Sequence, residues 1–315
     1  MAVAPEIAAY LEGLAQVDLP PLESQPLADI REQAALFAHV HARDPQPVDV
    51  VEDRELPGPA CEIPVRVYDP DPEETSPVVA YFHGGGFVFM SIETHDRICR
   101  RLANAANAVV VSVDYRLAPE HCFPAALDDC MAVTHWLTDH AAEIGGDPNR
   151  IAVAGDSAGG NLAAATALAS RNGGPGLAGQ VLVYPVIDAA CDTPSFDEHA
   201  EGYLLAASTM RWFWEQYLGP DGDPTDCYAS VLRTEDLSGA PPALIITAEH
   251  DVLRDEGEAY GHRLRGAGVT VSSLRYPGMI HGFIGMDALT PAADAAMAEI
   301  AAFLQRVFDQ RATGS

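Results

Sequence analysis

The chain has 315 residues, with 46 acidic residues against 18 basic ones, and its net charge is −28 at pH 7. All 18 basic residues are arginine, which excludes enzymes that need a lysine amine, such as serine-lysine hydrolases and Schiff-base enzymes. Because nothing supplies a basic patch, we expect no nucleic acid and no anionic membrane as a partner.

In chain order, the sequence begins with a helical segment, 1–44, that no strand of the core type follows. Eight runs then have the apolar pattern of β-strands. They are 48–54, 63–68, 78–82, 109–113, 151–154, 180–184, 243–247 and 269–276. From the third run onward they alternate with helical patterns such as 124–141 and 255–266. This alternation predicts an α/β fold with a mostly parallel sheet and helices on both faces.

The motif His-Gly-Gly-Gly-Phe at 83–87 follows directly after the third strand. Glycines allow a loop to bring backbone N–H groups close to a developing oxyanion. We therefore predict Gly84 and Gly85 as oxyanion donors, together with Ala158 further along the chain. The alternative is a flexible loop or a phosphate cradle, but no P-loop lysine follows and the spacing G-x-G-x-x-G is absent here.

The motif Gly-Asp-Ser-Ala-Gly-Gly at 155–160 lies between the strand 151–154 and a helix-prone, alanine-rich stretch. A sharp turn between a strand and a helix is the nucleophile elbow of serine hydrolases, in which small residues let the neighbouring chains pass. The pattern G-x-S-x-G alone is short enough to arise by chance as a structural turn. Its setting favours Ser157 as a nucleophile.

Two carboxylates near these motifs could be mistaken for catalytic groups, and we assign both a structural role. Asp156 is predicted to hydrogen-bond the backbone around the elbow. Glu120 is predicted to form a partly buried ion pair with Arg116, which fixes the loop after its strand.

A second segment, 187–225, also departs from the alternation of strands and helices. We interpret 1–44 and 187–225 together as a cap over the active site, with 45–186 and 226–315 forming the core. Aromatic residues in such a cap commonly pack it onto the core, and one face can also line an acyl pocket. Three aromatic residues are predicted to bind substrate, namely Phe87, Trp212 and Trp214.

The remaining partners of a serine nucleophile must follow in the order acid, then histidine, if the fold is that of an α/β-hydrolase. Asp251 lies just past the strand 243–247, where the carboxyl end of a strand delivers functional groups. His281 lies in a loop beyond the last strand and is predicted to be the base. Alternatives close in the sequence are His250 and His262 for the base, and Asp255 and Glu256 for the acid.

Several motifs together carry a family resemblance. They are His-Gly-Gly-Gly at 83–86, Asp-Tyr-Arg-Leu-Ala-Pro-Glu at 114–120, Gly-Asp-Ser-Ala-Gly-Gly at 155–160, Asp-Val-Leu-Arg-Asp-Glu at 251–256 and His-Gly-Phe at 281–283. Over about residues 45–310 the chain resembles the hormone-sensitive lipase family of bacterial and archaeal esterases. Val252 stands where that family often has proline, and Val231 ends a stretch that is more usually Ala-Ser-Pro. Both departures affect loop rigidity and no proposed catalytic group.

The resemblance implies an α/β-hydrolase fold with a helical cap, and a carboxylesterase that acts on uncharged short- to medium-chain acyl esters. Its partner is then a small-molecule ester, and neither a metal nor an organic cofactor is required. The resemblance also allows a homodimer through an edge strand or a helix near the C-terminus. Two alternatives stay open: an amidase or deacetylase with the same triad, and a small-molecule receptor on the same fold. The presence of Ser157, Asp251 and His281 together disfavours the receptor.

The sequence also predicts the environment of the protein. No n-region, h-region or long apolar run is found, so we expect a soluble, cytoplasmic protein. The six cysteines lack paired short spacing, which favours reduced thiols over disulfides or a zinc site. A codon bias toward arginine explains the missing lysines but not the excess of carboxylates. We therefore hypothesise a halophilic source, because salt screens the repulsion among carboxylates.

Overall fold

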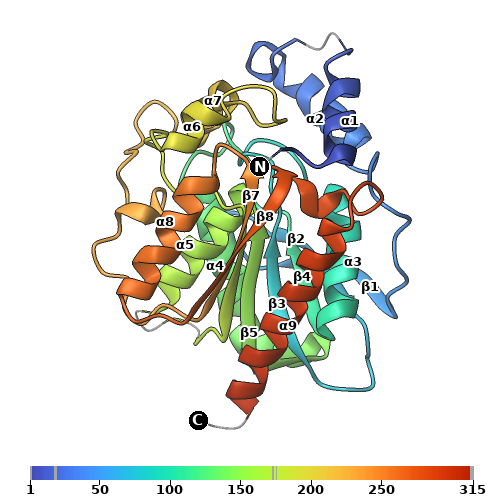
Figure 1. Ribbon diagram of the computed structural model, residues 1–315. Helices are drawn as coiled ribbons and strands as arrows, with labels where there is room; N and C mark the ends of the chain where they lie inside the picture. The colour runs from blue at the N-terminus through green and yellow to red at the C-terminus, as the bar shows by residue number, and fades with distance from the viewer. Residues whose placement is uncertain (1, 18–19, 172–173, 175, 313–315) are drawn as a thin grey trace.

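A computed structural model describes residues 2–17, 20–171, 174 and 176–312 (Figure 1). Its eight-stranded sheet has the strand order β1-β2-β4-β3-β5-β6-β7-β8. The strands are β1 Val50–Leu56, β2 Ile63–Asp69, β3 Ser76–Phe82, β4 Val109–Val113, β5 Gly146–Asp156, β6 Gly179–Val183, β7 Ala243–His250 and β8 Val271–Ile280. β2 is antiparallel to β1 and β4, and the other neighbouring pairs are parallel. The predicted mostly parallel sheet is confirmed.

Helices cover both faces of this sheet, as the alternating pattern predicts (Figure 1). The helices are α1 Pro5–Leu14, α2 Leu27–Phe37, α3 Ile92–Ala106, α4 Ala125–His140, α5 Ala158–Ser170, α6 Pro194–Glu198, α7 Ala207–Leu218, α8 Arg254–Gly266 and α9 Ala292–Ala312. α3 and α9 pack against each other and the sheet, while α4, α5 and α8 contact β5, β6 and β7 from the opposite face. None of the helices in the described part of the chain is long and apolar enough to cross a bilayer.

Alternating side chains along β3 divide the core into two layers. Val78 and Phe82 belong to the buried cluster that α4 and α5 share, whereas Val79 and Tyr81 belong to the cluster beneath α3 and α9. Successive side chains of a strand point to opposite faces, so a strand covered on both sides is apolar at nearly every position. The carboxyl ends of these buried strands are thereby held in fixed positions.

The two segments that interrupt the alternation lie at one end of the molecule. Figure 1 shows α1 and α2, in blue, beside α6 and α7, in yellow, above the ends of β7 and β8. α7 contacts the short 3₁₀ helix Leu22–Ser24, and the hydroxyl of Thr209 donates to the carboxylate of Glu23 at 3.2 Å. The two segments therefore touch, as a cap built from both would require.

The ion pair predicted between Arg116 and Glu120 is not formed. Arg116 instead makes a bidentate pair with Asp129 of α4, at 2.8 Å to each carboxylate oxygen, because Asp129 is buried and faces the loop after β4. Glu120 pairs with Arg31 of α2 at 2.8 Å. Arg31 also donates to the carbonyl of Val88 at 3.0 Å, so this arginine ties α2 to the loop that follows β3.

Candidate active site

Ser157 lies in the turn between β5 and α5 with φ of 56° and ψ of −120°. This backbone region is strained for a residue with a side chain, and such strain is typical of functional sites. A Cβ atom on Gly159 would collide with the backbone oxygen of Phe82, and one on Gly155 would collide with Gly159. The elbow therefore has the backbone that its motif predicts, and its glycines are required by packing.

The three residues predicted as a triad lie in one hydrogen-bonded chain. Nε2 of His281 is 2.9 Å from Oγ of Ser157, and Nδ1 of His281 is 2.8 Å from Oδ2 of Asp251. Asp251 is buried, and its other oxygen accepts the N–H of Leu253 at 3.0 Å. If Nδ1 carries the proton, it donates to Asp251, and Nε2 is then free to accept the serine hydroxyl proton.

The four alternatives considered for the acid and the base lie elsewhere. His250 stacks on the ring of Tyr203 at 5.2 Å between ring centroids, and His262 is exposed on α8. Asp255 and Glu256, also on α8, each accept a backbone N–H from the segment that follows β6. In the described part of the chain, none of the four takes part in the hydrogen bonds at the elbow.

The glycine loop corrects one predicted oxyanion donor. The N–H of Gly84 donates to Oδ1 of Asp156 at 3.1 Å, so it is not free and the prediction for Gly84 is wrong. The direction of each N–H depends on the backbone conformation, which changes sharply at Gly85, where φ is 108°. Among the described residues, no protein acceptor is found for the N–H groups of Gly85, Gly86 or Ala158. These three are the candidates for binding an oxyanion.

Asp156, the residue before the nucleophile, is the centre of a buried network beneath this loop. Its Oδ1 accepts hydrogen bonds from the N–H of Gly84 at 3.1 Å and from the hydroxyl of Tyr81 at 2.8 Å, and lies 3.2 Å from Nε2 of His95. Burial alone would raise the pKa of Asp156, but the charge of His95 and the hydrogen bonds from His95 and Tyr81 outweigh it and lower that pKa. Asp156 thus bonds backbone, as predicted, but the backbone of the glycine loop.

His83 also holds the glycine loop in place, and its ring is neutral. Burial, with the nearby charge of His95, lowers the pKa of His83 to about 3. Nδ1 of His83 lies 2.7 Å from the carbonyl oxygen of Gly84, and the hydroxyl of Tyr115 donates to the carbonyl of His83 at 2.7 Å. The start of the loop is therefore fixed by hydrogen bonds on both sides of the peptide chain.

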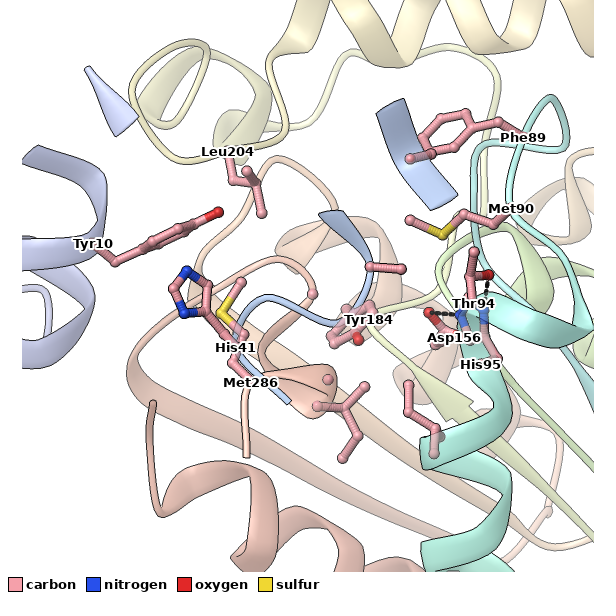
Figure 2. Close-up of a pocket in the computed structure, with 16 residues that line it drawn as sticks. Tyr10, His41, Phe89, Met90, Thr94, His95, Asp156, Tyr184, Leu204 and Met286 are labelled. Carbon is pink, nitrogen blue, oxygen red and sulfur yellow. Dashed lines mark hydrogen bonds and ion pairs between the residues drawn. The ribbon is translucent and has the colours of Figure 1, made fainter. Parts of the chain in front are cut away.

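A cavity of about 270 Å³, here called the inner cavity, lies in front of the elbow and is lined in part by Asp156 and Tyr184 (Figure 2). Tyr184, whose ring centroid is 4.6 Å from that of His281, and Gly282 both line it. The rest of its lining is Tyr10, Ala34, Ala38, His41, Phe89, Met90, Thr94, His95, Ile98, Asp156, Leu204, Ile284, Gly285 and Met286. Within the described ranges, no group of three or more His, Cys, Asp or Glu side chains could hold a metal ion.

The aromatic residues predicted to bind substrate are absent from this described lining. Phe87 is fully buried and stacks on Tyr217 of α7 at 3.7 Å between ring centroids. Trp214 is also buried, beside Phe87, and Trp212 packs partly buried against Phe213. These rings attach α7 to the core and do not line the inner cavity, so their contact with substrate stays a prediction.

The sequence prediction missed the residues that line the inner cavity, because no local motif marks them. Tyr184 directly follows β6, and its place just past the carboxyl end of a parallel strand is a signal that could have identified it. Tyr10 and His41 come from the segment 1–44, and Leu204 from 187–225. Only the packing of those segments brings them together.

Comparisons with known proteins agree with this geometry. A family model described as an alpha/beta hydrolase fold matches residues 79–285. The chain is 47% identical over 253 residues to carboxylesterase NlhH of Mycobacterium tuberculosis, with 78% of each chain covered. It is 36% identical over 318 residues to ethyl acetate hydrolase of Pseudomonas putida, which covers 97% of this chain and 99% of that one. A solved structure of a hyperthermophilic esterase from the archaeon Pyrobaculum calidifontis matches with a TM-score of 0.92 at 44% identity, covering 97% of this chain and 99% of that chain.

Proposed function

Since the chain belongs to the hormone-sensitive lipase family of alpha/beta hydrolases and is a carboxylic ester hydrolase, we propose that Ser157, His281 and Asp251 form its catalytic triad. One observation carries the proposal. His281 lies 2.9 Å from the serine hydroxyl through Nε2 and 2.8 Å from the buried carboxylate through Nδ1. Serine hydrolases of unrelated folds use this same arrangement.

In the proposed reaction, His281 accepts the hydroxyl proton of Ser157 while Oγ attacks the ester carbonyl carbon. Asp251 orients the imidazole and stabilises its charged form. The tetrahedral intermediate then breaks its bond to the alcohol oxygen, which leaves with the proton from His281, and the acyl group stays on Oγ. Water gives a proton to His281 and attacks the acyl carbon. The second tetrahedral intermediate then breaks its bond to Oγ, which takes the proton back from His281, so the acid leaves and the serine hydroxyl is restored.

The negative charge of the tetrahedral intermediate needs donors that are already in place. We assign this role to the N–H groups of Gly85, Gly86 and Ala158, since that of Gly84 is bonded to Asp156. The loss of one such donor costs roughly 3 kcal/mol of transition-state stabilisation in serine hydrolases. A Cβ on Gly86 would collide with the ring of Phe213, so α7 packs directly against this loop.

The proposed substrates are uncharged acyl esters of short to medium chain length. The inner cavity is largely apolar, and its size of about 270 Å³ suits a small group attached to the reacting carbonyl. The net charge of −28 disfavours anionic substrates. The segments 1–44 and 187–225 contribute to its lining through Tyr10 and Leu204, which supports their interpretation as a cap.

The test is hydrolysis of p-nitrophenyl acetate, butyrate and hexanoate by wild type, Ser157→Ala and Ser208→Ala. We expect kcat to fall by about 10⁴-fold or more in Ser157→Ala and to be unchanged in Ser208→Ala, which alters an exposed serine of α7. Matching p-nitroanilides distinguish an amidase. Ester turnover that survives in Ser157→Ala would place the chemistry elsewhere, and no turnover by wild type on either series would favour a binding protein.

We also propose that the acidic surface is an adaptation to high salt. With 46 acidic residues against 18 basic ones, repulsion destabilises the fold in dilute buffer. At molar potassium chloride the Debye length shortens to about 3 Å, which screens that repulsion. The midpoint of thermal unfolding is expected to rise from dilute buffer to molar salt. A midpoint that stays equal or falls would contradict this origin of the charge.

A further inference from the structure

A second cavity, here called the outer cavity, lies between α1 and α2 and has a volume of about 640 Å³. Its lining comprises Ala9, Tyr10, Gly13, Leu14, Val17, Leu22, Gln25, Ile30, Gln33, Ala34, Val40, His41, Phe89 and Leu204. It shares part of that lining with the inner cavity, through Tyr10, Ala34, His41, Phe89 and Leu204. The two cavities therefore meet along a common wall, and the outer one lies farther from the elbow.

The chemistry of the outer cavity differs from that of an ordinary surface. Among the described residues that line it, none is acidic and none is arginine, in a chain whose net charge is −28. Its two amide side chains satisfy each other in part, since Nε2 of Gln33 donates to Oε1 of Gln25 at 3.0 Å. A lining without acidic or arginine side chains favours an uncharged, apolar occupant.

The outer cavity also gathers apolar side chains that remain in contact with water. Val17, Val40 and Leu204 line it and are 54%, 57% and 45% exposed. Apart from Leu36 of α2, no other large apolar side chain is exposed in the described part of the chain. An exposed apolar patch of this kind marks a surface that a partner protein, a membrane or a ligand covers, and each methylene of a ligand that leaves water there contributes to binding.

The position of the outer cavity relative to Ser157 and His281 indicates which part of an ester substrate would occupy it. Figure 2 shows Tyr10, His41 and Leu204 on one side of the inner cavity, with Thr94, His95 and Asp156 on the other. Tyr184 lies between these two sides, against His281. A flexible alkyl chain attached to the ester group at Ser157 would enter the inner cavity beside Tyr184. From there it would extend along the residues that both cavities share and reach the outer cavity.

We propose that the outer cavity is a subsite for a long linear alkyl chain of the ester substrate, so that esters with a longer chain are hydrolysed in addition to the short- and medium-chain esters proposed above. This proposal rests on the ester hydrolysis proposed for Ser157. The chain belongs either to the acyl part or to the alcohol part of the ester. Two substrate series distinguish these sources, p-nitrophenyl alkanoates from acetate to laurate and alkyl acetates from ethyl to dodecyl.

Gly13→Leu is the variant that fills the outer cavity with little disturbance. Gly13 lies on α1 and lines the outer cavity but not the inner one, and a Cβ there would meet no atom within 4 Å. Leucine also favours the helix over glycine. Gly266→Leu is the matched control, because Gly266 ends α8 away from both cavities and a Cβ there likewise has nothing within 4 Å.

In wild type, we expect kcat/KM to rise with chain length in one series, by up to about fourfold for each methylene that leaves water. Gly13→Leu should leave acetate and butyrate hydrolysis unchanged and should lower kcat/KM for the longest chains by about tenfold or more. Gly266→Leu should follow wild type throughout. Identical chain-length profiles for Gly13→Leu and Gly266→Leu in both series would overturn the proposal, while the triad would stand on the acetate rate.

A binding measurement tests the subsite without turnover. In the Ser157→Ala background, dodecyl acetate should raise the midpoint of thermal unfolding, because a ligand that binds only the folded state stabilises it. Adding Gly13→Leu should remove most of that rise, and adding Gly266→Leu should not. An equal rise in both double variants would show that the chain binds elsewhere and would contradict the proposal.

Discussion

The loops at the carboxyl ends of the strands and the helices α1 and α2 meet at the inner cavity, but they are held in place differently. Asp251 and Asp156 are buried, and each makes several hydrogen bonds to neighbouring groups. α2 is instead attached to the core through one buried side chain, Ile30, and through the ion pair between Arg31 and Glu120, whose side chains are 32% and 51% exposed. The region that carries the chemistry is therefore fixed by burial, and the region that we expect to select the substrate is held by weaker contacts.

This difference teaches where function is sensitive to change. At a site with buried, mutually bonded polar groups, the removal of one group leaves its partners unsatisfied, which is costly. In a water-exposed apolar lining, the removal of one side chain loses only its own contact area. Equivalent substitutions in the two regions should therefore have effects of very different size.

The largest expected effect is at His281 in the catalytic region, and His41 is the histidine with which it is compared in the region of α1 and α2. His281→Ala removes the proposed base and should lower kcat by about 10⁴- to 10⁶-fold. His41→Ala removes a ring that stacks edge-on against Tyr10 and should change KM by less than about tenfold. His262→Ala, on an exposed face of α8, is the control. Comparable losses of kcat at His281 and His41 would break the distinction between the regions.

Asp156→Asn should have an intermediate effect, through the position of the glycine loop. The amide keeps the shape but accepts less strongly from Gly84 and Tyr81. We expect kcat to fall by about 10²-fold, as when an oxyanion donor is displaced, with KM unchanged. Steady-state kinetics on p-nitrophenyl butyrate separates the two parameters. A rise in KM at constant kcat would show that Asp156 shapes the substrate cavity instead.

The same carboxylate should make stability depend on acidity. Because the pKa of Asp156 is lowered from 3.8 in the folded protein, its ionised form stabilises the fold above that value. This contribution is lost as the pH falls through the lower, folded pKa. The difference in unfolding free energy between wild type and Asp156→Asn, measured in urea, should therefore narrow below pH 3.8. A difference that is constant with pH would contradict the assignment of the charge to Asp156.

The smallest expected effect is at the ion pair between Arg31 and Glu120. Both side chains are partly exposed, so Glu120→Gln should lower the unfolding free energy by less than about 1 kcal/mol. Turnover of p-nitrophenyl acetate should not change. A double-mutant cycle with Arg31→Gln isolates the pair, and a coupling well above that size would show that α2 is held as firmly as the catalytic loops.

Sequence patterns predicted the strands and the order of the triad because both depend on local constraints. Val109–Val113 is buried along its length and has the apolar run of a central strand. The elbow at Ser157 requires glycine where two backbones approach, so its motif is visible in the sequence. Asp251 and His281 could be located because each follows a strand of the sheet.

The errors arose where packing or backbone direction decides the outcome. Whether the N–H of Gly84 or that of Gly86 faces a substrate depends on dihedral angles that glycine leaves open. Arg116 pairs with Asp129 because α4 packs against the loop that carries Arg116. No spacing of residues in the sequence indicates this contact. The helices α1 and α2 carry no motif, and their contribution to the cavities follows from the tertiary fold alone.

The most direct test of the proposed triad is covalent labelling with a diethyl p-nitrophenyl phosphate ester, followed by peptide mass spectrometry. A serine activated by its histidine should displace p-nitrophenol and retain a single diethylphosphoryl group, on the peptide that contains Ser157. The label should be absent in Ser157→Ala and form far more slowly in His281→Ala. Loss of ester hydrolysis with the label on any other residue would contradict the account.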